Sequence, residues 1–322
     1  MRTSGLGSLP GTDVAGGVRL ALADVDLPWL PEFPARGPWA GMIGRSLGMA
    51  EGLGATLLAG EWHLADVPGI DQRRARATLR DDLDICEENA QGFTGTLRLT
   101  TAGPWTLAAA TLLPRGGRVL GDRVARRDLA QALAAGVAQV RGELARRLPG
   151  ATVTLQVDEP SLPAVLAGSV PTEGGYFRHR AVGTEEAVTL LAGLGGDVLH
   201  CCAPGLDVEA AIGPHGAGFS AVALDARLLG RPDWERLGPL LEDGRLLWLG
   251  LADAAAAVAP TADRLTADAL AALRPLELGP VLQESIVLTP SCGLASWPVA
   301  QVPRVFAALR TTAERLDDEL AR

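Results

Sequence analysis

The stretch GDVLHCC (residues 196–202) has the form of a buried β-strand that ends in reactive side chains, because a short apolar run leads to a histidine and two adjacent cysteines. Seven other short apolar runs resemble it and alternate with longer segments whose apolar residues recur three and four positions apart. The expected strands are SGLGSLP (4–10), DLPWLPEFP (26–34), GTLRLT (95–100), ATVTLQVDEP (151–160), GDVLHCC (196–202), GFSAVALDA (218–226), RLLWLGLAD (245–253) and ESIVLTPSCG (284–293). Eight strands with helices between them predict an α/β fold of the (β/α)8 TIM-barrel type.

The segments between these strands have the periodicity of amphipathic helices. The expected helices are 13–24, 71–90, 125–148, 183–194, 232–241, 261–274 and 300–319. Two stretches, 112–122 and 169–184, have the composition of exposed loops. Because no Ser/Pro-rich linker divides the sequence, we expect residues 1–322 to form a single barrel domain.

Composition limits the function further. The net charge is −9 and the basic residues form no stripe, so a nucleic-acid partner is not expected. The N-terminus lacks a signal-peptide core and no apolar run is long enough to span a bilayer, which predicts a cytoplasmic protein without membrane contact. The sequence contains no lysine, which excludes Schiff-base aldolases and pyridoxal-phosphate enzymes.

Polar residues gather at the C-terminal ends of the expected strands, where TIM barrels carry their chemistry. They are Ser8, Glu32, Asp158, Glu159, His200, Cys202, Asp225 and Cys292.

Alternation of side chains along a strand places His200 and Cys202 on one face and Cys201 on the other. His200 and Cys202 can therefore share an ion inside the barrel, and Asp225 and Cys292 at neighbouring strand ends are placed to complete its ligand set. Two thiolates, one imidazole and one carboxylate suit zinc better than magnesium or calcium. From the residues alone, an alternative remains in which His200 caps a strand, the cysteines only fill the core and Asp225 caps a helix.

Several motifs together resemble one family. LHCC with the following LDA, LTPSCGL, LQVDEPSL and the opening GLGSLPGT are similar, in this order along the whole chain, to the C-terminal catalytic barrel of cobalamin-independent methionine synthase, in the methionine synthase and uroporphyrinogen decarboxylase-like superfamily. The resemblance implies a methyltransferase that makes methionine from homocysteine on a bound zinc ion. It implies the zinc ligands His200, Cys202, Asp225 and Cys292, although the family normally has glutamate at the third of these positions.

The same resemblance implies a binding site for homocysteine. Its carboxylate would contact the opening turn, Leu6, Gly7 and Ser8, and its ammonium group would lie between Glu32 and Asp158. Asp158 is also the residue to which we assign a catalytic role. Backbone N–H groups and paired carboxylates are chemically suited to a zwitterion of this kind.

The sequence departs from the family where the methyl donor should bind. Ala110, Ala164 and Ala255 stand at the positions of a tryptophan that packs on the pterin, a glutamate that holds it, and a histidine that protonates the departing folate. The preceding homologous barrel of full-length synthases also has no counterpart here. Because methyltetrahydrofolate is a poor donor without acid assistance, we expect another donor, such as a methyl-corrinoid on a partner protein.

Three other functions stay open on the sequence. A zinc-dependent alkyltransferase could act on another thiol, such as coenzyme M, although two carboxylates would repel its sulfonate. A porphyrinogen decarboxylase would share the barrel but would have no use for the cysteines. A barrel that only binds zinc or an amino acid would need no donor site.

Overall fold

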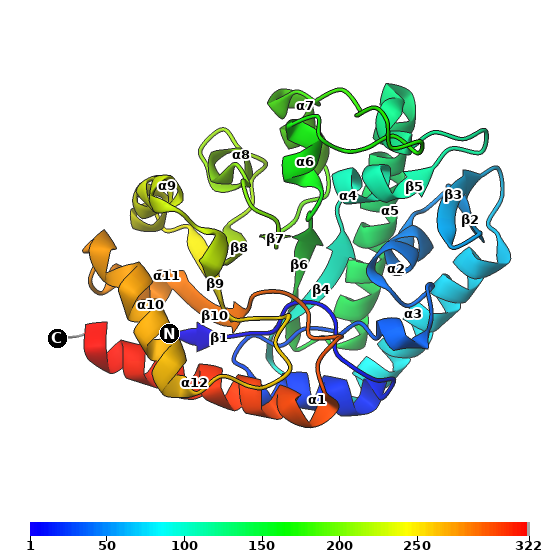
Figure 1. Ribbon diagram of the computed structural model, residues 1–322. Coiled ribbons are helices and arrows are strands. Elements are labelled where there is room, and N and C mark those ends of the chain that lie inside the picture. The colour runs from blue at the N-terminus through cyan, green and yellow to red at the C-terminus, as the bar shows by residue number, and fades with distance from the viewer. Residues whose placement is uncertain (321–322) are drawn as a thin grey trace.

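The computed structural model describes residues 1–320 as a parallel sheet curled into a barrel-like layer and covered by helices (Figure 1). The strands are β1 (Arg2–Thr3), β2 (Gly54–Leu58), β3 (Glu61–Ala65), β4 (Gly95–Ala102), β5 (Thr111–Leu112), β6 (Ala151–Asp158), β7 (Val198–Cys201), β8 (Ala221–Asp225), β9 (Leu246–Ala252) and β10 (Ile286–Pro290). The main sheet has the order β1-β10-β9-β8-β7-β6-β4, with every neighbouring pair parallel. The predicted TIM-barrel-like α/β fold is confirmed.

The helices alternate with these strands. They are α1 (Val14–Asp24), α2 (Met42–Met49), α3 (Ile70–Asn89), α4 (Pro104–Ala110), α5 (Arg123–Arg147), α6 (Leu162–Leu166), α7 (Thr184–Ala192), α8 (Val208–Ile212), α9 (Arg231–Glu242), α10 (Ala262–Leu273), α11 (Val281–Ser285) and α12 (Val302–Leu320). Each of the seven helices expected from periodicity is present, with ends that differ by at most three residues from the prediction. The short helices α2, α4, α6, α8 and α11 were not predicted, because one or two turns carry too little periodic signal.

The segment 26–34 occupies the eighth barrel position without forming a regular strand. It joins β1 and β4 through isolated bridges, Ser4 with Leu27 and Trp29 with Arg98, and a third bridge joins Ser8 to Glu32. The prolines of DLPWLPEFP explain the difference from the prediction, because proline has no N–H to donate to a ladder. The expected strand 4–10 is likewise reduced to β1 at residues 2–3 and to isolated bridges at Ser4 and Ser8.

A small second sheet, β2-β3-β5, lies outside the barrel and was not predicted. The β2–β3 hairpin lies at the edge of the molecule in Figure 1. Its two-residue turn is formed by Ala59 and Gly60, with φ of 50° and 88°. A turn with both φ angles positive normally has the sequence Asn-Gly or Asp-Gly. Because Ala59 stands in the first position here, the sequence does not indicate a hairpin.

Each face of the main sheet packs against its own apolar core. The larger lies between the sheet and the helices and contains Cys201, whereas a smaller cluster, with Leu6, Val198 and Trp248, lies inside the barrel. The guanidinium of Arg98 lies 4.3 Å from the centre of the Trp248 ring within this interior. The barrel is therefore a packed core, and its free surface for chemistry is the C-terminal edge of the strands.

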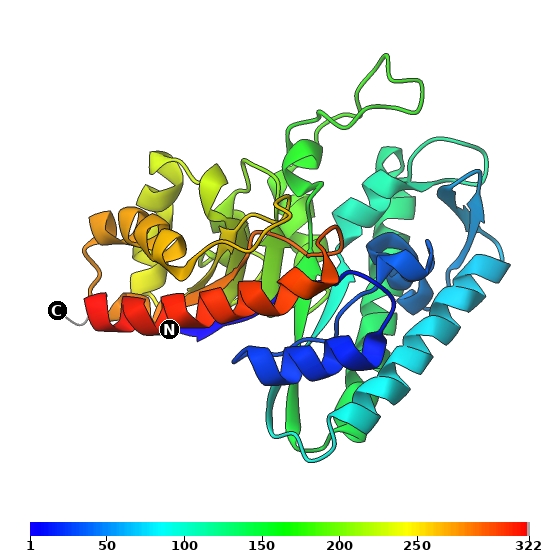
Figure 2. The same cartoon turned by 60° about the horizontal axis from the view of Figure 1, so that its bottom comes forward.

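The ends of the described chain lie close together, because the amino group of Met1 forms an ion pair with Asp317 on α12. Between α6 and α7 a loop projects beyond the rest of the molecule (Figure 2). Tyr176 and Phe177 on this loop are exposed, as expected for an insertion in 169–184. Within residues 1–320, no helix is both long and apolar enough to cross a membrane.

Candidate metal centre

Three side chains from two separated strands meet at the C-terminal edge of the barrel. His200 lies on β7, Cys202 follows it, and Cys292 follows β10. One ligand atom from each lies within 4.8 Å of the other two. Since β8 and β9 stand between β7 and β10 in the sheet, only the curl of the sheet brings these residues together. The group has the chemistry and spacing needed to hold a metal ion.

Strand alternation separates the two neighbouring cysteines. Cys201 points into the core under the helices, is 1% exposed, and has a pKa raised to about 12 by burial. Cys202 points to the centre instead. Its pKa is lowered to about 6 by the hydrogen bond with Cys292, and the charge of His200 acts in the same direction against burial. The pKa of Cys292 is raised by the same hydrogen bond and by burial, so one of the two thiols ionises at the expense of the other.

His200 is oriented by Asp158, the last residue of β6. Its Nδ1 lies 2.8 Å from Oδ1 of Asp158, and its Nε2 is buried with no hydrogen-bond partner among the described residues. Because a carboxylate can only accept, Nδ1 carries the proton and the lone pair of Nε2 is free for a metal. Burial lowers the pKa of His200, but the hydrogen bond and the charge of Asp158, with smaller contributions from the charge of Cys202 and the backbone of Ser291, together outweigh it, and the net pKa is raised.

Asp158 and Glu32 each use one carboxylate oxygen for protein contacts. Oδ1 of Asp158 also accepts a 2.6 Å hydrogen bond from Nε2 of Gln156. Oε1 of Glu32 accepts from Arg45, at 3.1 Å, and from Thr100, at 3.0 Å. Among the described residues, no hydrogen bond uses Oδ2 of Asp158 or Oε2 of Glu32. The pKa of Glu32 is raised by burial and by the charge of Asp158, although Arg45 opposes the shift.

The opening turn lies against the segment that carries Cys292. Gly7 has a φ of 65° and its carbonyl accepts a 2.7 Å hydrogen bond from Nε1 of Trp29. The carbonyl of Ser8 accepts from the backbone N of Leu294, at 2.7 Å. A Cβ at Gly293 would lie 2.3 Å from Oγ of Ser8, so only glycine allows this approach. Leu6 faces the barrel interior.

The structure does not bring Asp225 into the group of three. Asp225 ends β8 and is buried, but both of its carboxylate oxygens accept hydrogen bonds from Arg227. The shorter side chain of aspartate is consistent with this separation. The prediction that Asp225 lies at the C-terminal edge of the barrel is therefore correct, but the sequence does not reveal that its partner is Arg227.

Glu159 is a buried residue at this edge whose role the sequence did not reveal. Its carboxylate accepts from the backbone N–H groups of Trp105 and Thr106, at 2.9 and 2.8 Å, and from Oγ1 of Thr106, at 2.7 Å. It thus anchors the first turn of α4, and burial raises its pKa to about 7. The GPWT sequence at the start of α4 was the available signal, since this helix has no side-chain N-cap of its own.

The positions expected to hold a methyl donor carry no functional side chain. Ala110 ends α4, Ala164 lies on α6, and Ala255 follows β9. Trp105 is fully buried and donates a 3.2 Å hydrogen bond to the carbonyl of Ala187. It therefore belongs to the core and cannot stack on a donor at the mouth of the barrel.

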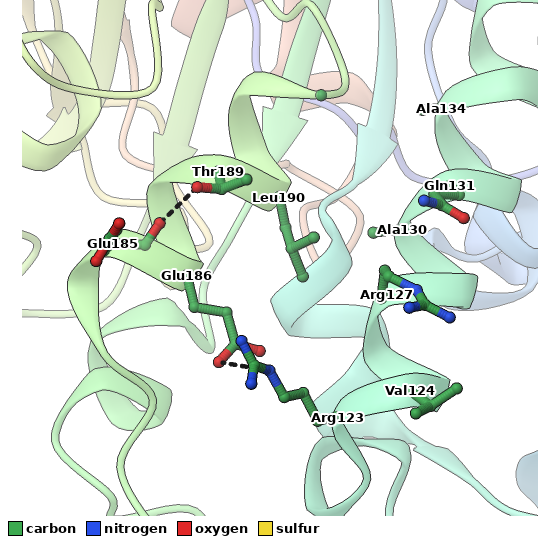
Figure 3. A pocket seen from close by; sticks show the side chains of 11 residues that line it. Arg123, Val124, Arg127, Ala130, Gln131, Ala134, Glu185, Glu186, Thr189 and Leu190 are labelled. Carbon is green, nitrogen blue, oxygen red and sulfur yellow. Dashed lines mark hydrogen bonds and ion pairs between the residues drawn. The ribbon is translucent and has the colours of Figure 1, made fainter.

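One groove lies away from the metal centre, between α5 and α7 on the outside of the barrel. Its volume is about 800 Å3. Figure 3 shows Arg123, Val124 and Arg127 on one side and Glu186, Thr189 and Leu190 on the other. Its lining comes from these two helices and from Gly193, directly after α7, so it is separate from the strand ends that carry His200.

Fold and site define an α/β barrel with an imidazole and two thiols close enough together at the C-terminal edge to hold a metal ion. Residues 103–315 match the family model for the catalytic domain of cobalamin-independent synthases. Because this is more than half of the 322 residues, the chain belongs to that family and is a methionine synthase-like catalytic domain, of the methyltransferase class. Asp158, His200, Cys202 and Cys292 lie within the matched residues, whereas Ser8 and Glu32 lie outside them.

One solved structure supports the fold. A B12-independent methionine synthase from Shewanella sp. W3-18-1, in complex with selenomethionine, has a TM-score of 0.59 at 15% identity, over 99% of this chain and 98% of that chain. A putative vitamin-B12 independent methionine synthase from Listeria monocytogenes has a TM-score of 0.46 at 16% identity, over 74% of this chain and 69% of that chain. At 15% identity the likeness to the Shewanella protein concerns the fold alone. No curated protein sequence matches the chain.

Proposed function

We propose that this chain is a zinc-dependent thiol methyltransferase that converts homocysteine to methionine. The observation that carries the proposal is the group formed by His200, Cys202 and Cys292, together with the buried Nε2 of His200, which has no hydrogen-bond partner among the described residues. Two thiols and an imidazole favour zinc over magnesium or calcium. When bound there, zinc would supply the Lewis acidity that ionises a thiol at neutral pH.

The residues around this centre have separate tasks in the proposal. Asp158 orients His200 through Nδ1, and Gln156 holds Asp158 in turn. The free oxygens of Asp158 and Glu32 accept the ammonium group of the amino acid. Since these two buried carboxylates repel each other, a cation between them relieves that repulsion.

The opening turn completes the amino-acid site. Backbone N–H groups of Leu6, Gly7 and Ser8 take the carboxylate of homocysteine, in the manner of an anion-binding turn. The contact between Ser8 and Gly293 ties this turn to the segment of Cys292. A thiol held at a metal bound by His200, Cys202 and Cys292 would lose its proton. Its sulfur would then form a bond to the donor's methyl carbon, in line with the bond from that carbon to the leaving group, which would depart with the bonding electrons.

A donor other than unaided methyltetrahydrofolate follows from the alanines at positions 110, 164 and 255. None of these residues can protonate a departing amine or pack on a pterin. A methyl-corrinoid donor, free or on a partner protein, needs no such acid because its leaving group is the reduced corrinoid itself. We further propose that the barrel of residues 1–322 acts as one domain in the cytoplasm, where thiols stay reduced.

Calorimetry of the zinc-loaded protein tests this function. Homocysteine should bind with release of a proton, and the heat should vary with the ionisation enthalpy of the buffer. Methionine, which has no thiol proton, should bind without proton release. Coenzyme M should bind more weakly than homocysteine, because its sulfonate meets two carboxylates. Tighter binding of coenzyme M would favour an alkyltransferase for another thiol, and no binding of either thiol would contradict the proposal.

A further inference from the structure

Asp225 has every carboxylate oxygen engaged by one neighbouring residue. Oδ1 accepts from the backbone N and from Nε of Arg227, both at 3.0 Å, and Oδ2 accepts from Nη2 of Arg227 at 2.7 Å. The backbone contact also caps the short 310 turn Ala226–Leu228 that follows β8. Asp225 could turn toward the metal centre only by breaking a bidentate ion pair and this cap.

Arg227 is itself fixed from the opposite side. Its Nη1 forms an ion pair with Oδ2 of Asp253, just after β9, and Oδ1 of Asp253 accepts a 2.8 Å hydrogen bond from the backbone N of Ala255. The guanidinium therefore bridges the ends of β8 and β9. Half of the Arg227 side chain is exposed. Its planar guanidinium nevertheless pairs with two carboxylates at once, those of Asp225 and Asp253, and is therefore held more firmly than an arginine in a single surface ion pair.

The other three expected ligands are free of such partners. His200 presents a buried Nε2 with no hydrogen bond among the described residues, and the thiols of Cys202 and Cys292 contact each other. Of the four expected ligands, three therefore lie together, and the fourth, Asp225, is bound by Arg227.

We propose that Arg227 keeps Asp225 away from the metal, so that the protein supplies three ligands and the fourth position belongs to the substrate's thiol. This inference rests on the proposed function and deepens it. Zinc sites with three protein ligands and one open position are the catalytic type. A thiol arriving at this centre has no protein carboxylate to displace, which distinguishes this chain from a site with four protein ligands.

The test is the absorption spectrum of the cobalt(II)-substituted protein, because the d–d bands of cobalt report the number and type of its ligands. Three variants are compared with the wild type: Asp225→Asn, Arg227→Gln and the double variant. Arg231→Gln is the matched control, since the Arg231 side chain is 90% exposed and its one ion pair among the described residues is with Glu235 on the same helix. Cobalt is titrated first, and 2-mercaptoethanol is then added as a thiol that needs no amino-acid site.

Asp225→Asn should leave the cobalt spectrum and affinity unchanged. Arg227→Gln should change the spectrum, because the freed carboxylate can enter the fourth position, and should weaken binding of 2-mercaptoethanol by about 10-fold or more. The double variant should restore the wild-type spectrum, and Arg231→Gln should resemble the wild type throughout.

Two results would overturn the inference while the proposed function stands. One is a changed spectrum or a large loss of cobalt affinity in Asp225→Asn, which would make Asp225 a ligand. The other is an unchanged spectrum in Arg227→Gln, which would remove the arginine's role. A wild-type protein that binds no cobalt would overturn both the inference and the proposed function.

Discussion

Nδ1 of His200 and Oδ1 of Asp158 lie 2.8 Å apart at the buried ends of two adjacent strands. In the proposed function this contact ties the candidate metal centre to the amino-acid site, because both sites use Asp158. Its Oδ1 contacts the imidazole, and among the described residues no hydrogen bond uses its Oδ2, which the proposal assigns to the substrate's ammonium group. Under this proposal a single carboxylate couples the position of the metal ligand to occupation of the amino-acid site.

Asp158→Asn should weaken both metal and substrate binding. Loss of the carboxylate partner of a histidine ligand typically costs about 10–100-fold in metal affinity. Loss of one charge-assisted bond to the ammonium group should cost about 1.5–3 kcal/mol of homocysteine binding. Competition with a zinc chelator measures the first effect and calorimetry the second.

Glu32→Gln is the comparison for this variant. Glu32 contacts Arg45 and Thr100 but not His200, so the change should reduce homocysteine affinity and leave zinc affinity as it is. Equal behaviour of the two variants would show that Asp158 does not act on the metal ligand.

The adjacent cysteines provide an internal test of the metal centre. Cys202→Ser should release most of the bound zinc, because a neutral hydroxyl is a far poorer zinc ligand than a thiolate. Cys201→Ser should keep one zinc per chain, since Cys201 is buried in the core beneath the helices. Elemental analysis of the purified variants decides between them. The reverse pattern would mean that Cys201, not Cys202, faces the barrel.

Glu159 should make stability depend on pH in a defined window. Its pKa is raised from 4.5 to about 7 by burial, so the folded chain holds a proton that the unfolded chain has already lost between these values. Folding stability from this group is therefore fully present below pH 4.5 and falls as the pH rises toward 7. Glu159→Gln does not titrate and should lack this loss.

Urea unfolding of both proteins across this range measures the effect. The stability difference should move in favour of the glutamine variant by roughly 3 kcal/mol, at about 1.4 kcal/mol per pKa unit. Glu235→Gln, at an exposed position on α9, should show no such trend. A difference between wild type and Glu159→Gln that stays constant with pH would contradict a raised pKa.

The methyl donor can be identified by a direct comparison of rates. Methylcobalamin should methylate homocysteine in the presence of the zinc protein faster than methyltetrahydrofolate at equal concentration. The reason is that a missing general acid costs a factor of about 10²–10⁴. Mass spectrometry of methionine formed from a labelled methyl group measures both rates. Rapid turnover with the folate alone would show that another residue supplies the proton.

The sequence predicts the barrel well because its signals are local. Helical periodicity and short apolar runs are properties of neighbouring residues, and they locate the long helices and most strands. The same is true of His200 and Cys202, whose shared face follows from the two-residue period of a strand. The proline-broken segment 26–34 and the Ala59–Gly60 turn depart from the expected forms, although each departure has a local physical cause.

The site is less predictable because its side chains contact residues that are distant in the sequence, or have more than one chemically suitable partner. Cys292 reaches His200 only through the curl of a sheet with two strands between them. Asp225 has two chemically sensible partners, a metal ion and the arginine two residues later, and a sequence cannot choose between them. Glu159 is similar, since its partner is the start of a helix more than fifty residues earlier in the chain.

X-ray absorption at the zinc edge, with and without homocysteine, tests the central claim most directly. Without substrate the zinc should have two sulfur neighbours at about 2.3 Å, from Cys202 and Cys292, and a nitrogen from His200 at roughly 2.0–2.1 Å. Addition of homocysteine should raise the sulfur count from two to three, because its thiol takes the open position. Absence of bound zinc, or a sulfur count that homocysteine leaves unchanged, would contradict a thiol methyltransferase built on this centre.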